Sequence, residues 1–259
     1  MVAIRTNSTL GTNFTQATLI AAIKTAMLAA GFNNPVDDYS FGSDRIFVYA
    51  FVTDATKTYG TVYYRIKVTA AFAISATIHS SWNSTNHTGN NGSLEFIFAT
   101  LANTNTVIFT SLNGGTEYKF VFLTQALSTI IPLGVISPAN KPNWWDLNQW
   151  NYAFFWNANT LNALTGTTLN PYANNNYTAF LNDSRMGAAN VQTGLSDILT
   201  GVLFFTNANR GVTGKSSEDL GSGAVLSSSR YNTIPSDTVN QDYLIINPVA
   251  GGLVIKVQS

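Results

Sequence analysis

The spacing of apolar residues predicts a run of β-strands in the first half of the chain. Apolar side chains recur at every second position in several short segments, which is the period of a strand with one covered face. The segment 46–52 is apolar throughout, as expected of a strand covered on both faces. The predicted strands are 46–52, 62–69, 72–78, 94–98, 107–109 and 118–122. The turns predicted between them are rich in Asn and Gly, which tolerate the positive φ of tight hairpins, and lie at 90–92, 103–105 and 113–115. We therefore expect an antiparallel β-meander.

One segment, residues 13–31, has the period of an amphipathic helix instead. Its apolar positions three or four apart are Ala17, Ile20, Ile23 and Met27. We expect Asn13 to be the N-cap and Gly31 to provide a left-handed C-cap. The fold class predicted from these patterns is α+β to mainly β: an N-terminal helix packed on an antiparallel β-meander, followed by a loop-rich, β-containing C-terminal region.

Prolines indicate where the first domain ends. Pro132, Pro138 and Pro142 cluster after the last predicted strand of the meander, and proline interrupts regular structure. The predicted organisation is a helix plus antiparallel sheet domain at 1–131, a Pro-containing connection at 132–143, and a Trp-rich segment with a loop-rich β domain at 144–259. Strand-like segments in the last part lie at 201–206, 243–246 and 253–257. We expect the last two of these to pair with each other.

Composition narrows the classes of function. Lys plus Arg and Asp plus Glu number 13 each, and charged residues are 10% of the 259, where about 25% is usual. A neutral chain with few cations lacks the basic surface that binds DNA or RNA. No apolar stretch is long enough for a membrane-spanning helix. Polarity comes instead from 29 asparagines and 32 threonines, and a neutral amide-rich surface suits permanent contact with other proteins.

Candidate catalytic and metal-binding residues are few. The sequence has no cysteine, which excludes thiolate chemistry. His79 and His87 flank a turn around Trp82, but a zinc site needs three or four ligands, and the nearest downstream carboxylate is Glu95. Gly214 and the two residues after it resemble the end of a phosphate-binding loop without its first glycine or its helix. We expect no catalytic residue, no cofactor and no metal.

A tryptophan-rich segment is the most unusual feature of the chain. Residues 144–156 hold four of the five tryptophans. Such rings fill a core or an interface, or, with neighbouring amides and a carboxylate, form a platform for sugar rings. The candidate residues for an interface or a glycan platform are Trp144, Trp145, Asp146, Asn148, Trp150 and Trp156.

Four short segments carry a resemblance to a known class of proteins. They are Ser81–Gly89, Asn113–Phe120, Leu133–Pro138 leading to Trp144 and Trp145, and Gln241–Pro248. Together they resemble uncharacterised structural proteins of the tail, baseplate or fibre of tailed bacteriophages. The resemblance implies a non-enzymatic, multi-copy component of the virion, in the tail, baseplate, neck or fibre.

The partners that this resemblance implies are other virion proteins and copies of the same chain, with assembly in the host cytoplasm. Two alternatives remain open at this point. One is a receptor- or glycan-binding module at a fibre tip that recognises a host-surface glycan. The other is a hydrolase of cell-wall sugars, for which Asp146 would be required. Nucleic acid and membrane are not expected partners.

Overall fold

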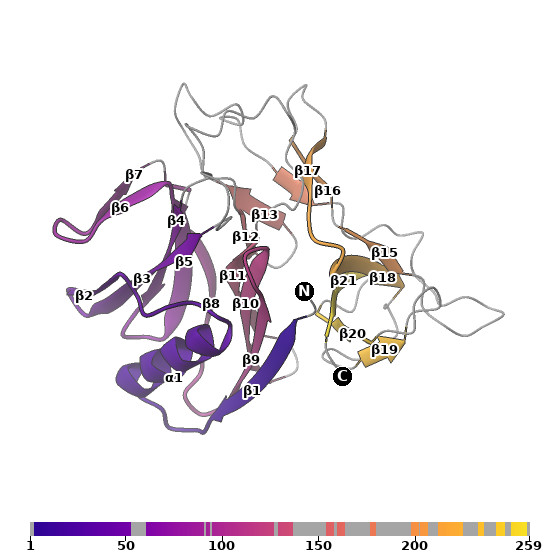
Figure 1. Cartoon of the computed structure of the whole chain (residues 1–259). Helices are drawn as coiled ribbons and strands as arrows, with labels where there is room; N and C mark the ends of the chain where they lie inside the picture. The colour runs from indigo at the N-terminus through magenta and orange to yellow at the C-terminus, as the bar shows by residue number, and fades with distance from the viewer. Residues whose placement is uncertain are drawn as a thin grey trace. The chain divides into compact units, whose positions relative to one another are not determined.

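The structure is a computed structural model, and it consists mainly of antiparallel β-sheet (Figure 1). The residues that it describes are 3–52, 61–90, 92–93, 95–126, 129–136, 154–157, 160–163, 177–179, 198–201, 203–206, 212–224, 233–235, 242–246 and 250–257. The chain divides into two compact units. The larger unit comprises residues 5–137 and 144–176, and the other comprises 1–4, 138–143 and 177–259. The predicted β-rich character is confirmed.

The larger unit contains the helix and most of the described strands. Its elements are β1 (Ile4–Leu10), α1 (Gln16–Ala29), β2 (Asp37–Phe41), β3 (Asp44–Val52), β4 (Thr61–Val68), β5 (Ala73–His79), β6 (Ser81–Asn83), β7 (Thr88–Asn90), β8 (Phe96–Thr100), β9 (Val107–Gly114), β10 (Tyr118–Gln125), β11 (Thr129–Ile136), β12 (Phe154–Asn157) and β13 (Thr160–Ala163).

The first sheet of this unit has the strand order β2-β3-β4-β5-β8, and each neighbouring pair is antiparallel. Alternation along β4 follows the predicted pattern, since Tyr64, Ile66 and Val68 are buried and the residues between them are only partly so. In β3 the predicted burial on both faces is also found, because Phe47 and Val48 point to opposite faces and are both fully buried.

The second sheet orders its strands β1-β9-β10-β11-β12-β13 within this unit. The β9–β10 hairpin turns at Gly115, whose φ of 68° is the positive value predicted for this turn. Strand β11 was not predicted, and Pro132 lies inside it opposite Phe122. The predicted meander is therefore two antiparallel sheets, and the second of them includes a strand, β11, beyond the last strand that we predicted for the meander.

One hydrophobic core joins the facing sides of the two sheets and the helix. Leu19, Ile23 and Met27 of α1 are buried in the same cluster as Tyr64 of the first sheet and Val121 of the second. The hydroxyl of Ser111 on β9 donates to the backbone oxygen of Ala26 on the helix at 2.9 Å. The helix is thus held by side chains that its own apolar period places on one face.

The helix ends are set by local hydrogen bonds. The predicted N-cap Asn13 is wrong: Asn13 has φ of 60°, and Thr15 caps the helix through a capping box with Thr18. The predicted Gly31 cap is confirmed, because Gly31 N–H donates to Leu28 O and Phe32 N–H to Met27 O, which is the Schellman pattern. The helix also follows β1 rather than opening the chain.

The smaller unit is described only in part. Its strands are β14 (Tyr177–Ala179), β15 (Ile198–Thr200), β16 (Leu203–Thr206), β17 (Val212–Lys215), β18 (Leu220–Ala224), β19 (Thr233–Pro235), β20 (Asp242–Ile245) and β21 (Ala250–Lys256). Five of them form an antiparallel sheet in the order β15-β18-β21-β20-β19. The predicted pairing of the last two strands is confirmed, with Tyr243 opposite Lys256. The domain boundary proposed at 132–143 stays a prediction.

Candidate functional site

Most of the tryptophan-rich segment lies outside the described residues. This holds for Trp144, Trp145, Asp146, Asn148 and Trp150. Trp156 belongs to β12, where its backbone pairs with Leu161 of β13. The interface or glycan platform predicted at these residues therefore stays a prediction. The described residues offer two other candidate sites, both in the larger unit.

The first candidate, the hairpin cluster, is formed by Asp37, Tyr39, His79, Trp82 and His87. Strands β6 and β7 form a small hairpin after β5. Side chains of this hairpin reach the face of the first sheet that points away from the core, because Trp82 Nε1 donates to Asp37 Oδ2 at 2.8 Å. The contact ties the hairpin to the edge strand β2, 45 residues earlier in the chain.

Asp37 is the centre of the hairpin cluster. Its carboxylate is 6% exposed, and the same oxygen that accepts from Trp82 lies 2.9 Å from Nδ1 of His87. The His87 ring stacks on Tyr39 with centroids 3.9 Å apart, and its side chain is 43% exposed. A buried carboxylate on Nδ1 orients the imidazole, which is how acid–base histidines are positioned. Here the same bonds also satisfy a buried charge.

His79 sits beneath the hairpin. Its Nε2 lies 2.9 Å from Thr77 Oγ1, and its buried Nδ1 makes no hydrogen bond. Gly89 lies so close that a Cβ there would be 2.5 Å from Nδ1. Burial, with a smaller contribution from the charge of Arg65, lowers the pKa of His79 to about 4. His79 is therefore a neutral packing residue at ordinary pH.

The hairpin cluster organises structure more clearly than it supports catalysis. Among the described residues, no group of three or more His, Asp or Glu side chains is placed to hold a metal ion. The two histidines that flank Trp82 do not share a ligand site, since one binds Asp37 and the other Thr77. Sequence reasoning missed Asp37 because its partners are brought together only by the fold.

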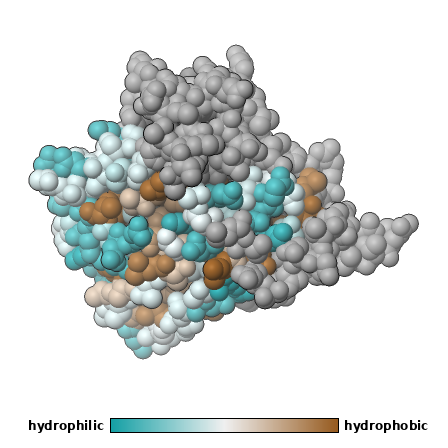
Figure 2. Space-filling view, viewed as in Figure 1, coloured by the Kyte–Doolittle hydropathy of each residue, from teal (hydrophilic) through white to brown (hydrophobic). Residues whose placement is uncertain are grey.

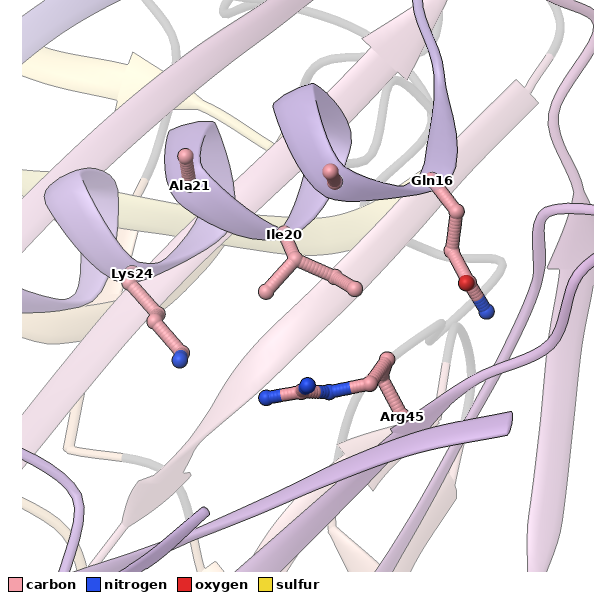
Figure 3. A pocket seen from close by; sticks show the side chains of 6 residues that line it. Gln16, Ile20, Ala21, Lys24 and Arg45 are labelled. Atoms are coloured by element: carbon pink, nitrogen blue, oxygen red, sulfur yellow. The ribbon is translucent and has the colours of Figure 1, made fainter. Parts of the chain in front are cut away.

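The second candidate, the helix pocket, lies beside α1. It has a volume of about 370 Å³ and is shown in Figure 3, where Lys24 and Arg45 extend toward the space below Ile20. Its lining residues are Gln16, Ala17, Ile20, Ala21, Lys24 and Arg45. Sequence analysis had no signal for this pocket, because Arg45 comes from the sheet and the other residues come from the helix.

Asp38 joins the two cations of the helix pocket. Its carboxylate forms ion pairs with Lys24 and with Arg45, the latter at 2.7 Å. Partial burial alone would raise the pKa of Asp38, but the hydrogen bonds and charges of Lys24 and Arg45 outweigh it and hold that pKa below its usual value. Gln16 closes the other end by donating to the backbone oxygens of Ser43 and Val68.

Large apolar side chains are exposed at several places. The large apolar residues described as exposed are Ile4, Leu28, Val36, Phe41, Val52, Ile97, Ile108 and Leu199, and Figure 2 shows apolar areas in brown scattered among hydrophilic ones. Phe41 on β2 is 73% exposed and Ile97 on β8 is 65% exposed. These two strands are the end strands of the first sheet.

No protein-family model matches the sequence, and no curated protein matches it significantly. Among the described helical residues, none forms a stretch long and apolar enough to cross a membrane.

Proposed function

We propose that this chain is a non-enzymatic structural component of a tailed-phage virion, in the tail, baseplate, neck or fibre, that acts through protein–protein contacts in a symmetric assembly. In this proposal, the sheets and the helix packed on them form the rigid body of each subunit. The end strands of the first sheet and the loop-rich C-terminal region contact other virion proteins or copies of the chain, and assembly takes place in the host cytoplasm.

The observation that carries the proposal is the apolar exposure at both ends of the first sheet. An end strand presents unpaired backbone N–H and C=O groups, which template pairing with another chain. Phe41 and Ile97 add large apolar side chains there, 73% and 65% exposed. Burying such groups against a neighbour gains free energy on assembly. The low charge content, 10% of the chain, reduces the desolvation cost of forming these contacts.

The test is the oligomeric state of the purified full chain, together with its presence in particles. We expect light scattering to show a defined oligomer, and mass spectrometry to find the protein in many copies per virion. Phe41→Ser is expected to weaken self-association. Leu28→Ser is the matched control, since Leu28 is an exposed apolar residue of α1 rather than of a sheet edge. A monomeric protein that is missing from particles would refute the proposal.

The tryptophan-rich segment favours a second candidate function. A receptor- or glycan-binding module would use its rings as a sugar platform. The polar side chains that would read hydroxyl groups are Asp146, Asn148, Gln149, Asn151 and Asn157. This candidate predicts adsorption of the protein to host-surface polysaccharide, weakened in Trp145→Ala and Trp150→Ala but not in Leu28→Ser. A glycan array without signal, and unchanged adsorption of both variants, would remove it.

A further inference from the structure

The helix pocket has a mixed chemistry that points to a particular kind of ligand. Residues Ala17, Ile20, Ala21 and Lys24 lie on one face of α1, because they are spaced by three, four and seven positions. The first three of these provide an apolar wall, and Lys24 with Arg45 provides a cationic end (Figure 3). A volume of about 370 Å³ is at the small end of ligand pockets, which span roughly 300–1,000 Å³.

The cationic end is not fully neutralised. Lys24 and Arg45 share one carboxylate, that of Asp38, so the three side chains carry a net charge of plus one. Asp38 accepts from a terminal nitrogen of Arg45, and the side chains of Lys24 and Arg45, which both line the pocket, are 25% and 36% exposed. An added carboxylate can therefore reach both cations and complements the charge that Asp38 leaves uncompensated.

We infer that the helix pocket binds a carboxylate on a short aliphatic stem, as carried by a glutamate side chain of a neighbouring protein chain. The stem lies against Ala17, Ile20 and Ala21, and the carboxylate pairs with Lys24 and Arg45. The inference rests on the proposed function only for the source of the glutamate. The binding chemistry itself belongs to the isolated chain and is tested there.

The experiment is a titration of the full chain, isotopically labelled, with the peptide acetyl-Ala-Glu-Ala-amide, followed by amide resonances of Ala17 and Ala21. The expected result is saturable shifts at these residues. The Gln analogue of the peptide is expected to bind about tenfold more weakly, because it lacks the charge. Absence of shifts with the Glu peptide, or equal binding of the Gln peptide, overturns the inference.

Three variants locate the site. Arg45→Gln is expected to weaken binding of the Glu peptide about tenfold. Lys67→Gln is the matched control: it removes a cation from the other face of the same sheet, where Lys67 pairs with Glu95, and binding is expected to stay unchanged. Ala21→Gln fills the pocket from an exposed helix position without threatening the fold, and it is expected to abolish binding.

Two further experiments ask whether the carboxylate comes from a protein, and whether the pocket inference can hold when the proposed function fails. Butyrate that saturates the pocket while the Glu peptide is excluded would overturn a protein source. Binding of the peptide by a protein that is missing from particles would leave the pocket chemistry standing and remove the virion role. The pocket inference and the proposed function therefore fail on different readouts.

Discussion

The indole N–H of Trp82 donates a 2.8 Å hydrogen bond to the carboxylate of Asp37, across 45 positions of sequence. The same carboxylate oxygen lies 2.9 Å from Nδ1 of His87. Two side chains of the β6–β7 hairpin thus satisfy one buried charge on the edge strand β2. These contacts hold the hairpin against the first sheet.

Trp82→Phe tests the energetic weight of this contact. The ring is kept but the donor is lost, so buried Asp37 loses a partner and the free energy of unfolding is expected to fall by about 1–3 kcal/mol. Urea unfolding of Trp82→Phe, Asp37→Ala and the double variant measures the coupling directly. We expect a coupling energy of about 1 kcal/mol or more. Strictly additive losses would show that the two residues contribute independently.

His79 makes stability depend on pH in a definite window. The pKa of His79 is lowered from 6.5 to about 4 in the folded protein, so below pH 6.5 the unfolded chain takes up a proton that the folded chain excludes. The free energy of unfolding is expected to fall, by an amount on the order of 2 kcal/mol after discounting for the partial exposure of the ring, as pH drops from 6.5 to about 4.

His79→Gln separates this effect from that of the carboxylates. Burial alone would raise the pKa of Glu95, but its bonds to Lys67 and Ser75 hold that pKa below the usual value. The pKa of Asp38 is lowered in the same way, because its bonds to Lys24 and Arg45 outweigh the effect of burial. Their stabilisation is present above their ordinary pKa values and is lost only as pH falls through their lower folded values. The urea midpoint should therefore depend less on pH between 6.5 and 4.5 in His79→Gln than in the unmodified protein. An unchanged pH dependence would show that another group causes the loss of stability in this range.

Gly134 is expected to be intolerant of any side chain. Its φ is 151°, and a Cβ there would lie 2.1 Å from the backbone oxygen of Lys119 and 2.6 Å from the Phe120 ring. Gly134→Ala must displace the β10–β11 pairing, and we expect a loss of more than about 3 kcal/mol in the free energy of unfolding. At Gly11 a Cβ meets nothing within 4 Å, so Gly11→Ala is the matched control and should leave the thermal midpoint almost unchanged.

Removing the helix N-cap is expected to cause a smaller loss of stability. Thr15 accepts from the Thr18 amide, and Thr18 Oγ1 accepts from the Thr15 amide. Thr15→Ala removes the side chain that satisfies a free helix N–H, which costs about 1 kcal/mol. Thermal unfolding of Thr15→Ala beside Thr104→Ala, an exposed loop position, measures it. A loss equal in the two variants would show that the cap contributes nothing.

The sequence predicted those parts of the fold that depend on local periodicity and turn chemistry. The alternation in β4, the Gly31 cap and the turn at Gly115 all follow from residues within a few positions of one another. The division into two sheets was missed, because the strands predicted at 46–98 and those predicted at 107–122 have the same pattern and only their packing assigns them to different sheets. Pro132 suggested a break, but the strand β11 accommodates it opposite Phe122.

The candidate sites were less accessible to sequence reasoning. Asp37, His87 and Trp82 carry no spacing signal, since the first lies 50 residues from the second and 45 from the third. The helix pocket is similar, because Arg45 joins residues of α1 only through the β2–β3 hairpin. Asp38 and Arg45 have no spacing that marks them as a site, and Lys24 reaches the same carboxylate only in the folded protein.

The end of helix α1 is interlocked with the β9–β10 hairpin. Lys119 Nζ donates to the backbone oxygen of Gly31 at 2.5 Å and lies over the rings of Phe32 and Phe51. A Cβ at Gly31 would collide with Asn113, next to the hairpin turn. The C-terminal end of the helix and the β9–β10 hairpin therefore pack directly against each other, and each helps to fix the position of the other. In kinetic terms, a substitution in either one should slow the same step of folding, because the junction joins residues 88 positions apart and closing so long a loop costs entropy.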